Sequence, residues 1–88
     1  MRRNADFLLR EVAGKQVIVP VGKAVAAFPG MITLNDSGAC IWQLLETEQT
    51  ADSLADAMAA RYEVDRERAY ADVVRFLDMI RPTGAVID

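Results

Sequence analysis

One stretch in the middle of this 88-residue chain predicts the fold class, because the signals of a strand, a helix start and a helix follow one another in it. It runs Ile32-Thr33-Leu34-Asn35-Asp36-Ser37-Gly38-Ala39-Cys40-Ile41-Trp42-Gln43-Leu44-Leu45. Polarity alternates from Met31 onward, so Ile32 and Leu34 are expected on one face of a short strand. Met31 and Thr33 then lie on the opposite face. We therefore expect a strand from Met31 to Leu34.

Asn35 begins the helix that follows this strand. Its side-chain oxygen can accept from an otherwise unpaired backbone N–H, and Asp36 lies at the positive end of the helix dipole. The helix is expected to run to about Glu46, with Trp42 largely buried in its apolar stripe. We interpret Gly38 as a small residue that permits close packing, since no glycine-rich phosphate motif surrounds it.

The residues before the strand predict a β-hairpin. Phe7 to Ala13 and Gln16 to Val21 are apolar runs. The link Gly14-Lys15 between them predicts a type II′ turn, because glycine supplies the positive φ at its first central position. Pro20 cannot donate to a ladder, so it is expected on a free edge or at a strand end. The hairpin and the short strand together predict a small antiparallel sheet.

Two further helices are expected after the first. Thr50 is the N-cap of one and Asp65 the N-cap of the other, each followed by apolar residues at helical spacing. Pro82 and Gly84 end the last helix. The tail from Ala85 to Ile87 is either a short strand or an apolar clasp on the core.

Composition and element order agree with one globular domain, since 52% of the residues are hydrophobic and 26% are charged. The predicted fold is α+β, a three-stranded antiparallel sheet followed by a three-helix bundle. Residues 1–34 hold the hairpin and third strand, residues 35–82 the three helices, and residues 83–88 the tail. A domain of this length has room for one core and excludes a large cleft between domains.

Residue types that carry chemistry are scarce. The chain has no His, and Cys40 is its one cysteine, which excludes an internal disulfide, a Cys/His zinc site and an imidazole base. We predict no catalytic residue, no cofactor and no metal site, and hence a protein that is not an enzyme. After Arg2 and Arg3, the charges of Asp6 and Arg10 interrupt the apolar run of a signal peptide, and no segment approaches the ~20 apolar residues of a membrane span. A cytoplasmic protein without a membrane partner is expected.

Charge is distributed unevenly along the chain. Ten Lys and Arg against thirteen Asp and Glu give a net charge of −3. Residues 36–88 hold five Arg and no Lys against eleven Asp and Glu, so the helical part alone carries −6. A surface of that sign repels phosphate groups, and no nucleic-acid partner is expected.

The element order and several short motifs resemble PqqD-like proteins over nearly the whole chain. The stretch quoted above is similar to the family's LN-x-[ST/G]-G-A-x-I-W signature. Asp72 to Ile80 is similar to its Asp-Val-x-x-Phe-Leu-x-x-[LI] helix, and Thr50, Tyr62 followed by Val64, and Gly84 also match. The resemblance implies a winged helix-turn-helix-like fold. It also implies a recognition element that binds the leader of a ribosomally made precursor peptide and delivers it to a modifying enzyme, often a radical S-adenosylmethionine maturase.

The resemblance places peptide binding in a groove between the third strand and the third helix. An edge strand has unpaired N–H and C=O groups, which an extended peptide can satisfy by adding a strand. On a helical wheel, one flank of the third helix combines a cation and a phenol with apolar positions, which suits an amphipathic peptide carrying acidic residues. The predicted peptide-binding residues are Met31, Ile32, Thr33, Leu34, Arg66, Tyr70, Val73, Val74 and Leu77.

Simpler interpretations stand beside these. Apolar periodic positions such as Leu34 and Leu77 are expected mostly in the core, and surface arginines are expected to be solvated, which makes Tyr70 and Val74 the better binding candidates. Two other functions stay open. One is a winged-helix DNA-binding regulator, which the negative charge disfavours. The other is an acyl or peptidyl carrier protein modified at Ser37, which the strand-rich first third disfavours.

Overall fold

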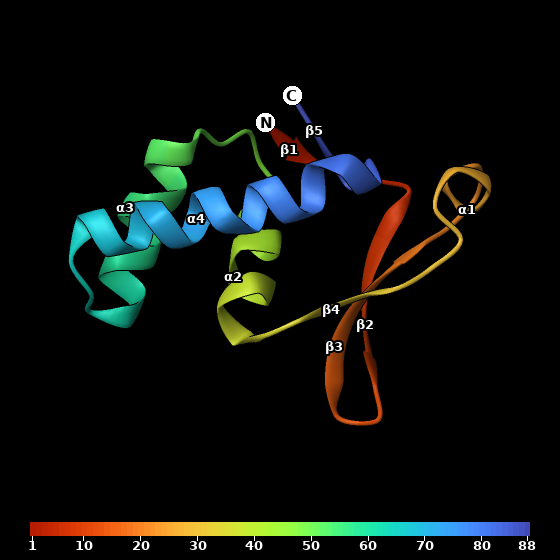
Figure 1. The fold of residues 1–88 in the computed structure, drawn as a ribbon, viewed down its shortest axis with the longest axis horizontal. Coiled ribbons are helices and arrows are strands. Elements are labelled where there is room, and N and C mark those ends of the chain that lie inside the picture. The colour runs from red at the N-terminus through yellow and green to blue at the C-terminus, as the bar shows by residue number, and fades with distance from the viewer.

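The computed structural model describes all 88 residues, with the long helices beside a small twisted sheet (Figure 1). The elements in chain order are β1 (Arg2–Arg3), β2 (Phe7–Val12), β3 (Lys15–Pro20), α1 (Ala24–Ala27), β4 (Ile32–Leu34), α2 (Asp36–Leu44), α3 (Ala51–Tyr62), α4 (Arg66–Ile80), a 3-10 turn η1 (Arg81–Thr83) and β5 (Val86–Ile87). The predicted α+β class and the three-stranded antiparallel sheet are confirmed.

Strands β2 and β3 form the predicted hairpin, but the turn lies one residue earlier than expected. Val12 pairs with Lys15, so the loop consists of Ala13 and Gly14. Their φ angles are 53° and 79°, and a type I′ turn requires positive φ at both central residues. The predicted type II′ turn at Gly14-Lys15 is wrong, because Lys15 is already paired in the ladder. Pro20 is the last residue of β3, as predicted.

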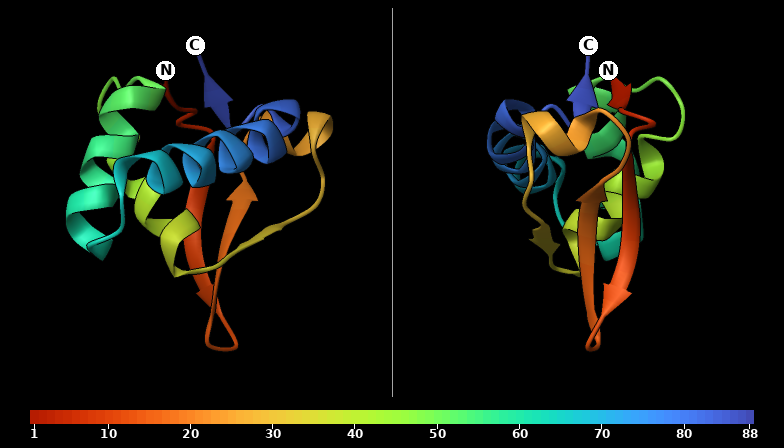
Figure 2. Two further views of the ribbon diagram at one scale, coloured as in Figure 1. Left: turned by 60° about the vertical axis from the view of Figure 1, so that its left-hand side comes forward. Right: turned by 90° about the vertical axis from the view of Figure 1, so that its right-hand side faces the viewer.

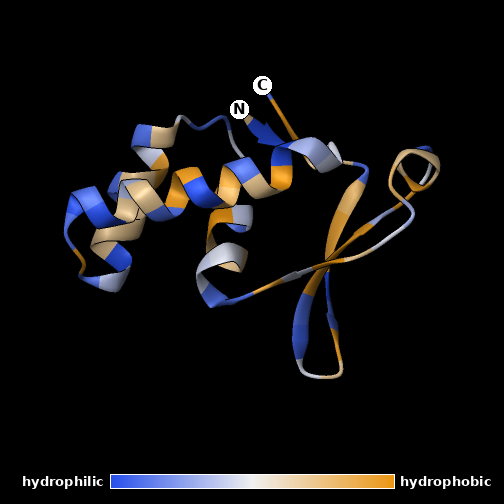
Figure 3. Cartoon of the chain, viewed as in Figure 1, coloured by the Kyte–Doolittle hydropathy of each residue, from blue (hydrophilic) through white to orange (hydrophobic).

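Strand β4 completes the sheet in the order β2-β3-β4, which makes β3 central and leaves β2 and β4 as the two edges. The predicted alternation is confirmed, since Ile32 and Leu34 are buried while Met31 is 62% exposed. The hairpin turn projects away from the helices (Figure 2). Hydrophilic residues gather in the part of the hairpin toward that turn, whereas the part near the helices is mostly hydrophobic (Figure 3).

Helices α2, α3 and α4 begin at the predicted caps. The side chains of Asn35, Thr50 and Asp65 each accept from the backbone N–H three residues further on, at 2.8, 3.0 and 2.8 Å. Each oxygen therefore satisfies one of the N–H groups that a helix start leaves unpaired. Helix α2 ends at Leu44, two residues before the expected end. None of the helices is both long and apolar enough to cross a membrane.

A cluster of 19 buried residues joins the sheet to the helices. Trp42 lies in this cluster with 1% of its surface exposed, as predicted. The tail belongs to the same cluster through Ala85 and Val86. Val86 and Ile87 also form strand β5, so the tail is both of the expected alternatives, a short strand and an apolar clasp.

Strand β1 and helix α1 have no counterpart in the sequence prediction. Strand β1 pairs with β5, which brings the two ends of the chain side by side in a separate two-stranded sheet (Figure 1). Helix α1 is a single turn in the small-residue stretch after the hairpin. Strands of two residues and helices of four are too short to show a periodic pattern, which is why neither was predicted.

Candidate functional site

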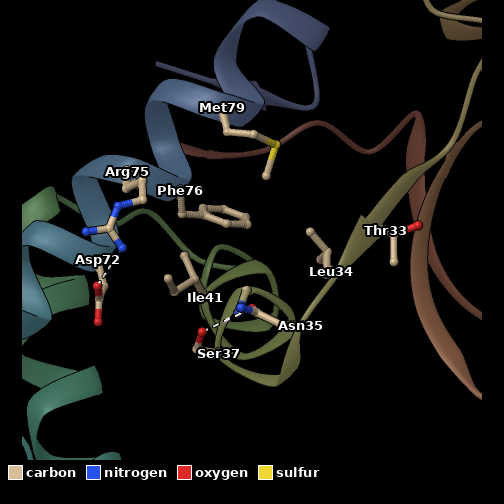
Figure 4. Close-up of a pocket in the computed structure, with 10 residues that line it drawn as sticks. Thr33, Leu34, Asn35, Ser37, Ile41, Asp72, Arg75, Phe76 and Met79 are labelled. Carbon is tan, nitrogen blue, oxygen red and sulfur yellow. Dashed lines mark hydrogen bonds and ion pairs between the residues drawn. The ribbon is translucent and has the colours of Figure 1, made fainter.

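An open groove of about 520 Å³ lies between β4, the start of α2 and one side of α4. The apolar residues of the groove are Leu34, Ile41, Phe76 and Met79, which come from these three elements and face one another (Figure 4). The first three are almost fully buried, whereas Met79 is 46% exposed. The groove thus has a fixed apolar floor and one flexible apolar side chain at its outer wall.

The rim of the groove is polar and carries no net charge. Asp72 and Arg75 form an ion pair within α4, with Arg75 Nη1 3.0 Å from Asp72 Oδ1. Ser37 Oγ donates to Asn35 Oδ1 at 3.1 Å at the opposite rim. An apolar floor with a polar rim is the usual composition of a site that binds part of another molecule.

Backbone groups of β4 also face outward, as the pairing of the sheet shows. Antiparallel strands alternate between pairs that exchange hydrogen bonds and pairs that do not. Val21 donates to the Asp6 carbonyl at 2.7 Å, so this residue directs its backbone groups toward the β2 side. By the same alternation Val17 also points to β2, while Gln16 and Ile18 point to β4.

The register then identifies the residue of β4 that is free at the edge. Leu34 pairs with Gln16 and Ile32 pairs with Ile18, so both direct their backbone groups to β3. Thr33 lies between them, and its N–H and C=O therefore point away from β3 toward the open edge. Since Thr33 also lines the groove, a free backbone donor and acceptor lie directly beside the apolar floor.

Gly38 lets α2 approach α4 closely at this place. A Cβ at this position would lie 3.1 Å from Asn35 Oδ1 and 3.4 Å from Phe76 Cε1. The 3.1 Å distance to Asn35 Oδ1 is shorter than ordinary van der Waals contact, and this oxygen is the atom that caps α2. The predicted close packing at Gly38 is confirmed. The absence of a side chain at this position leaves room for Phe76 in the floor of the groove.

The structure divides the predicted binding residues into two groups. Thr33 and Leu34 line the groove, with Ile32 in the core and Met31 exposed just before the strand. Of the residues predicted on α4, Val73 and Leu77 are 0% and 2% exposed. They belong to the core and are not available to a partner. This agrees with the simpler interpretation, in which apolar residues at helical spacing are buried.

The other predicted residues of α4, Arg66, Tyr70 and Val74, do not line the groove. A helix advances by about 100° per residue, so Tyr70 and Val74 lie on one side of the buried stripe and the groove residues Asp72 and Met79 lie on the other. The predicted flank is therefore not the one that faces β4. The pattern could not distinguish the two flanks, because both border the same buried stripe.

Arg66 is instead bound to α3. Its guanidinium lies 2.7 Å from Asp52 Oδ1 and 2.6 Å from Asp56 Oδ1. The hydrogen bonds to Asp52 and Asp56 raise the pKa of Arg66 above its usual value, so the side chain keeps its charge. Its guanidinium carbon also lies 5.5 Å from the ring centroid of Tyr70. Arg66 therefore joins α3 to α4, and the acidic partner predicted for it is already present in the chain.

The groove side of α4 is formed by Asp72, Arg75, Phe76 and Met79, and the sequence pattern did not predict it. The partial signal for it was the apolar Met79 outside the buried stripe. No three or more His, Cys, Asp or Glu side chains lie together where they could hold a metal ion.

Comparison with known proteins gives the family. Residues 15–86 match the model of the family described as coenzyme PQQ synthesis protein D (PqqD). Because the match spans most of the chain, the chain belongs to the PqqD family, and the resemblance noted from its motifs is confirmed. No curated protein matches the chain.

A solved structure has a similar fold. It is described as TbiB1 in complex with the TbiA(beta) leader peptide, and it matches with a TM-score of 0.75 at 22% sequence identity. The match covers 100% of both chains. At this identity the likeness establishes the shared fold.

Proposed function

We propose that this chain is a non-catalytic recognition protein that binds the leader of a ribosomally made precursor peptide and presents it to a modifying enzyme. The leader adds as a strand along Met31 to Leu34, and the modifying enzyme is a radical S-adenosylmethionine maturase. The observation that carries the proposal is the free N–H and C=O of Thr33 beside an apolar groove. A strand edge alone provides pairing without selectivity, and the groove provides a place for side chains.

The geometry supports this mode of binding in two ways. A peptide strand beside β4 would exchange hydrogen bonds with Thr33, while alternate side chains point into the groove. There they would contact Leu34, Ile41 and Phe76, and Met79 could adjust to their shape because its thioether chain is flexible. The similar fold of TbiB1, which is described as a leader-peptide complex, further supports a peptide as the ligand.

The charge and composition of the chain support a peptide ligand and a separate modifying enzyme. A helical part with a net charge of −6 is a poor surface for nucleic acid, which favours a peptide over DNA. The chain offers no His and no metal-binding group, so we propose that the chemistry is carried out by the partner enzyme. The maturase type rests on the family resemblance. The genes adjacent to this one test it, because a short precursor peptide and a radical S-adenosylmethionine enzyme are expected there and their absence would contradict the assignment.

The binding mode is tested by titrating the ¹⁵N-labelled chain with the leader segment of its precursor peptide. The largest amide shifts are expected on β4 and on the groove side of α4. Thr33→Pro removes the N–H at the free edge, and we expect about tenfold weaker binding, the value of one lost hydrogen bond. Thr33→Val keeps that N–H and serves as the matched control, with an affinity within about twofold of the parent.

Two results would contradict the proposal. Equal loss of affinity in Thr33→Val and Thr33→Pro would show that the hydroxyl and not the backbone is recognised. Shifts confined to residues 52–61 of α3, with β4 and α4 unchanged, would place the peptide elsewhere on the molecule.

A further inference from the structure

The sheet has a second free edge, which is longer than the first. Strand β2 has six residues against three in β4, and it pairs only with β3. Val17 and Val19 direct their backbone groups to β2, and their partners there are Arg10 and Leu8. Leu9 lies between these partners, so its N–H and C=O point away from β3 toward open space.

A groove of about 740 Å³ runs beside this edge, and its charge differs from that of the groove beside β4. Three arginines, Arg2, Arg3 and Arg10, line it against the carboxylates of Asp6 and Glu46. Arg3 is 4.0 Å from Glu46 Oε1. Arg2 and Arg10 take part in none of the ion pairs of the molecule. Two cations are therefore available to a partner at this edge.

The two sides of the edge have different chemistry. Leu9 points to the core side of the sheet, where the groove is also lined by Trp42, and Arg10 points to the opposite face. A strand added here would place alternate side chains beside the half-buried Leu9 and beside the Arg10 cation. An extended segment in which apolar and acidic residues alternate fits both sides.

Arg10 also covers the edge when no partner is present. Its Nη1 donates to the Leu9 carbonyl at 3.3 Å, which is the carbonyl that faces open space. This contact is long and joins a cation to a neutral acceptor. A carboxylate is the stronger acceptor, so an acidic segment can bind the Arg10 guanidinium. The Leu9 carbonyl is then free to pair with the added strand. Arg10 thus protects the edge and favours an acidic occupant.

A second copy of the chain fits this edge poorly. Antiparallel pairing of β2 with another β2 would bring both sets of arginines to one interface, and like charges across a strand pair are destabilising. The charge pattern instead matches an acidic partner.

We propose that the β2 edge is a second strand-addition site, which takes an extended acidic segment of the modifying enzyme while the leader occupies β4. The two edges lie on opposite sides of β3, about 10 Å apart by the usual strand spacing, so both can be paired at once. The site itself rests on the geometry of β2. Only the origin of the segment rests on the proposed function.

The site is tested with a defined probe, the capped peptide acetyl-Val-Glu-Val-Glu-Val-Glu-amide, titrated into the ¹⁵N-labelled chain. Amide shifts are expected on Leu9 and its neighbours in β2, and the same peptide with Lys in place of Glu should bind at least about tenfold more weakly. Arg10→Gln should weaken the Glu peptide about tenfold. Lys15→Gln, which removes a cation of the same hairpin outside the groove, should leave it unchanged. Shifts on β4 alone, or equal binding of both peptides, would overturn the site.

The partner is tested with the intact modifying enzyme. Arg10→Gln should lower the affinity for the enzyme about tenfold without changing the affinity for the leader, whereas Lys15→Gln should change neither. An unchanged enzyme affinity in Arg10→Gln would overturn the assignment of the segment to the enzyme. Thr33→Pro should leave the affinity of β2 for the Glu peptide unchanged. A wrong assignment of the leader to β4 can therefore be distinguished from a wrong assignment of the acidic segment to β2. Concentration-dependent dimerisation through β2 without any peptide would assign the edge to a second copy and overturn the proposal.

Discussion

The two edges of the central sheet present the same backbone chemistry in different surroundings. Strand β4 is short and lies beside α4, where one Asp and one Arg leave the groove without net charge. Strand β2 is twice as long and lies beside a groove with three arginines and two carboxylates. Both edges offer N–H and C=O groups that are not paired within the sheet, so the backbone alone cannot decide what each edge binds.

The difference shows that the element beside a strand edge sets its selectivity. At β4 the neighbouring floor of Leu34, Ile41 and Phe76 is apolar and almost buried, which favours shape and apolar contact. At β2 the arginines, of which Arg2 and Arg10 are exposed, favour charge complementarity. One small sheet can therefore hold two different extended segments.

The largest effect is expected from Trp42→Ala, because it destabilises the core on which both strand edges depend. Trp42 is 1% exposed, belongs to the core and also lines the groove beside β2. Its truncation should lower the free energy of unfolding by about 3–5 kcal/mol, a large part of the stability of a domain of this size. Urea denaturation followed by far-UV circular dichroism measures the change. A loss below about 1 kcal/mol would contradict the tight packing around this ring.

The second effect separates the two flanks of α4. Met79→Asp places a charge on the apolar wall of the groove, and leader affinity should fall about 10- to 100-fold, because that charge must be buried against the peptide. Val74→Asp is the matched control on the opposite flank and should leave binding within about twofold. Isothermal titration calorimetry with the leader distinguishes them. The reverse ranking would return the site to the flank of Arg66, Tyr70 and Val74 that the helical wheel predicted.

Asn35→Ala should have a smaller effect, confined to the β4 side. It removes the cap of α2 and one rim residue of the groove, and we expect the free energy of unfolding to fall by about 1 kcal/mol. Asn35→Asp keeps the capping oxygen and should retain most of the stability. Thermal denaturation of both variants provides the comparison. If Asn35→Asp were as unstable as Asn35→Ala, the cap would not be the source of the effect.

Salt should produce the smallest difference and distinguish the edges without any mutation. Raising the ionic strength from about 0.1 M to about 1 M shortens the screening length from about 10 Å to about 3 Å. The Glu-containing probe at β2 should then bind about threefold more weakly, while the leader at β4 should change less. Fluorescence anisotropy at both ionic strengths measures this. Equal salt dependence at the two edges would mean that charge does not distinguish them.

Much of the fold could be predicted from local signals. The caps at Asn35, Thr50 and Asp65 were identified from the sequence because a capping side chain acts on its own helix within three residues. The alternation from Met31 to Leu34 was equally local. The predicted position of the hairpin turn was wrong, because Ala13 adopts a positive φ that is uncommon for any residue other than glycine.

The sequence by itself determined the class of this protein. Its element order, helix caps and family motifs are properties of residues close together in the chain. The tertiary structure alone decided which flank of α4 faces β4 and which residues of the strand edges are free. Both depend on contacts between distant segments, such as Phe76 with Gly38 and Ile18 with Ile32. The residue pattern of one helix or one strand contains no information about which other element packs beside that helix or strand.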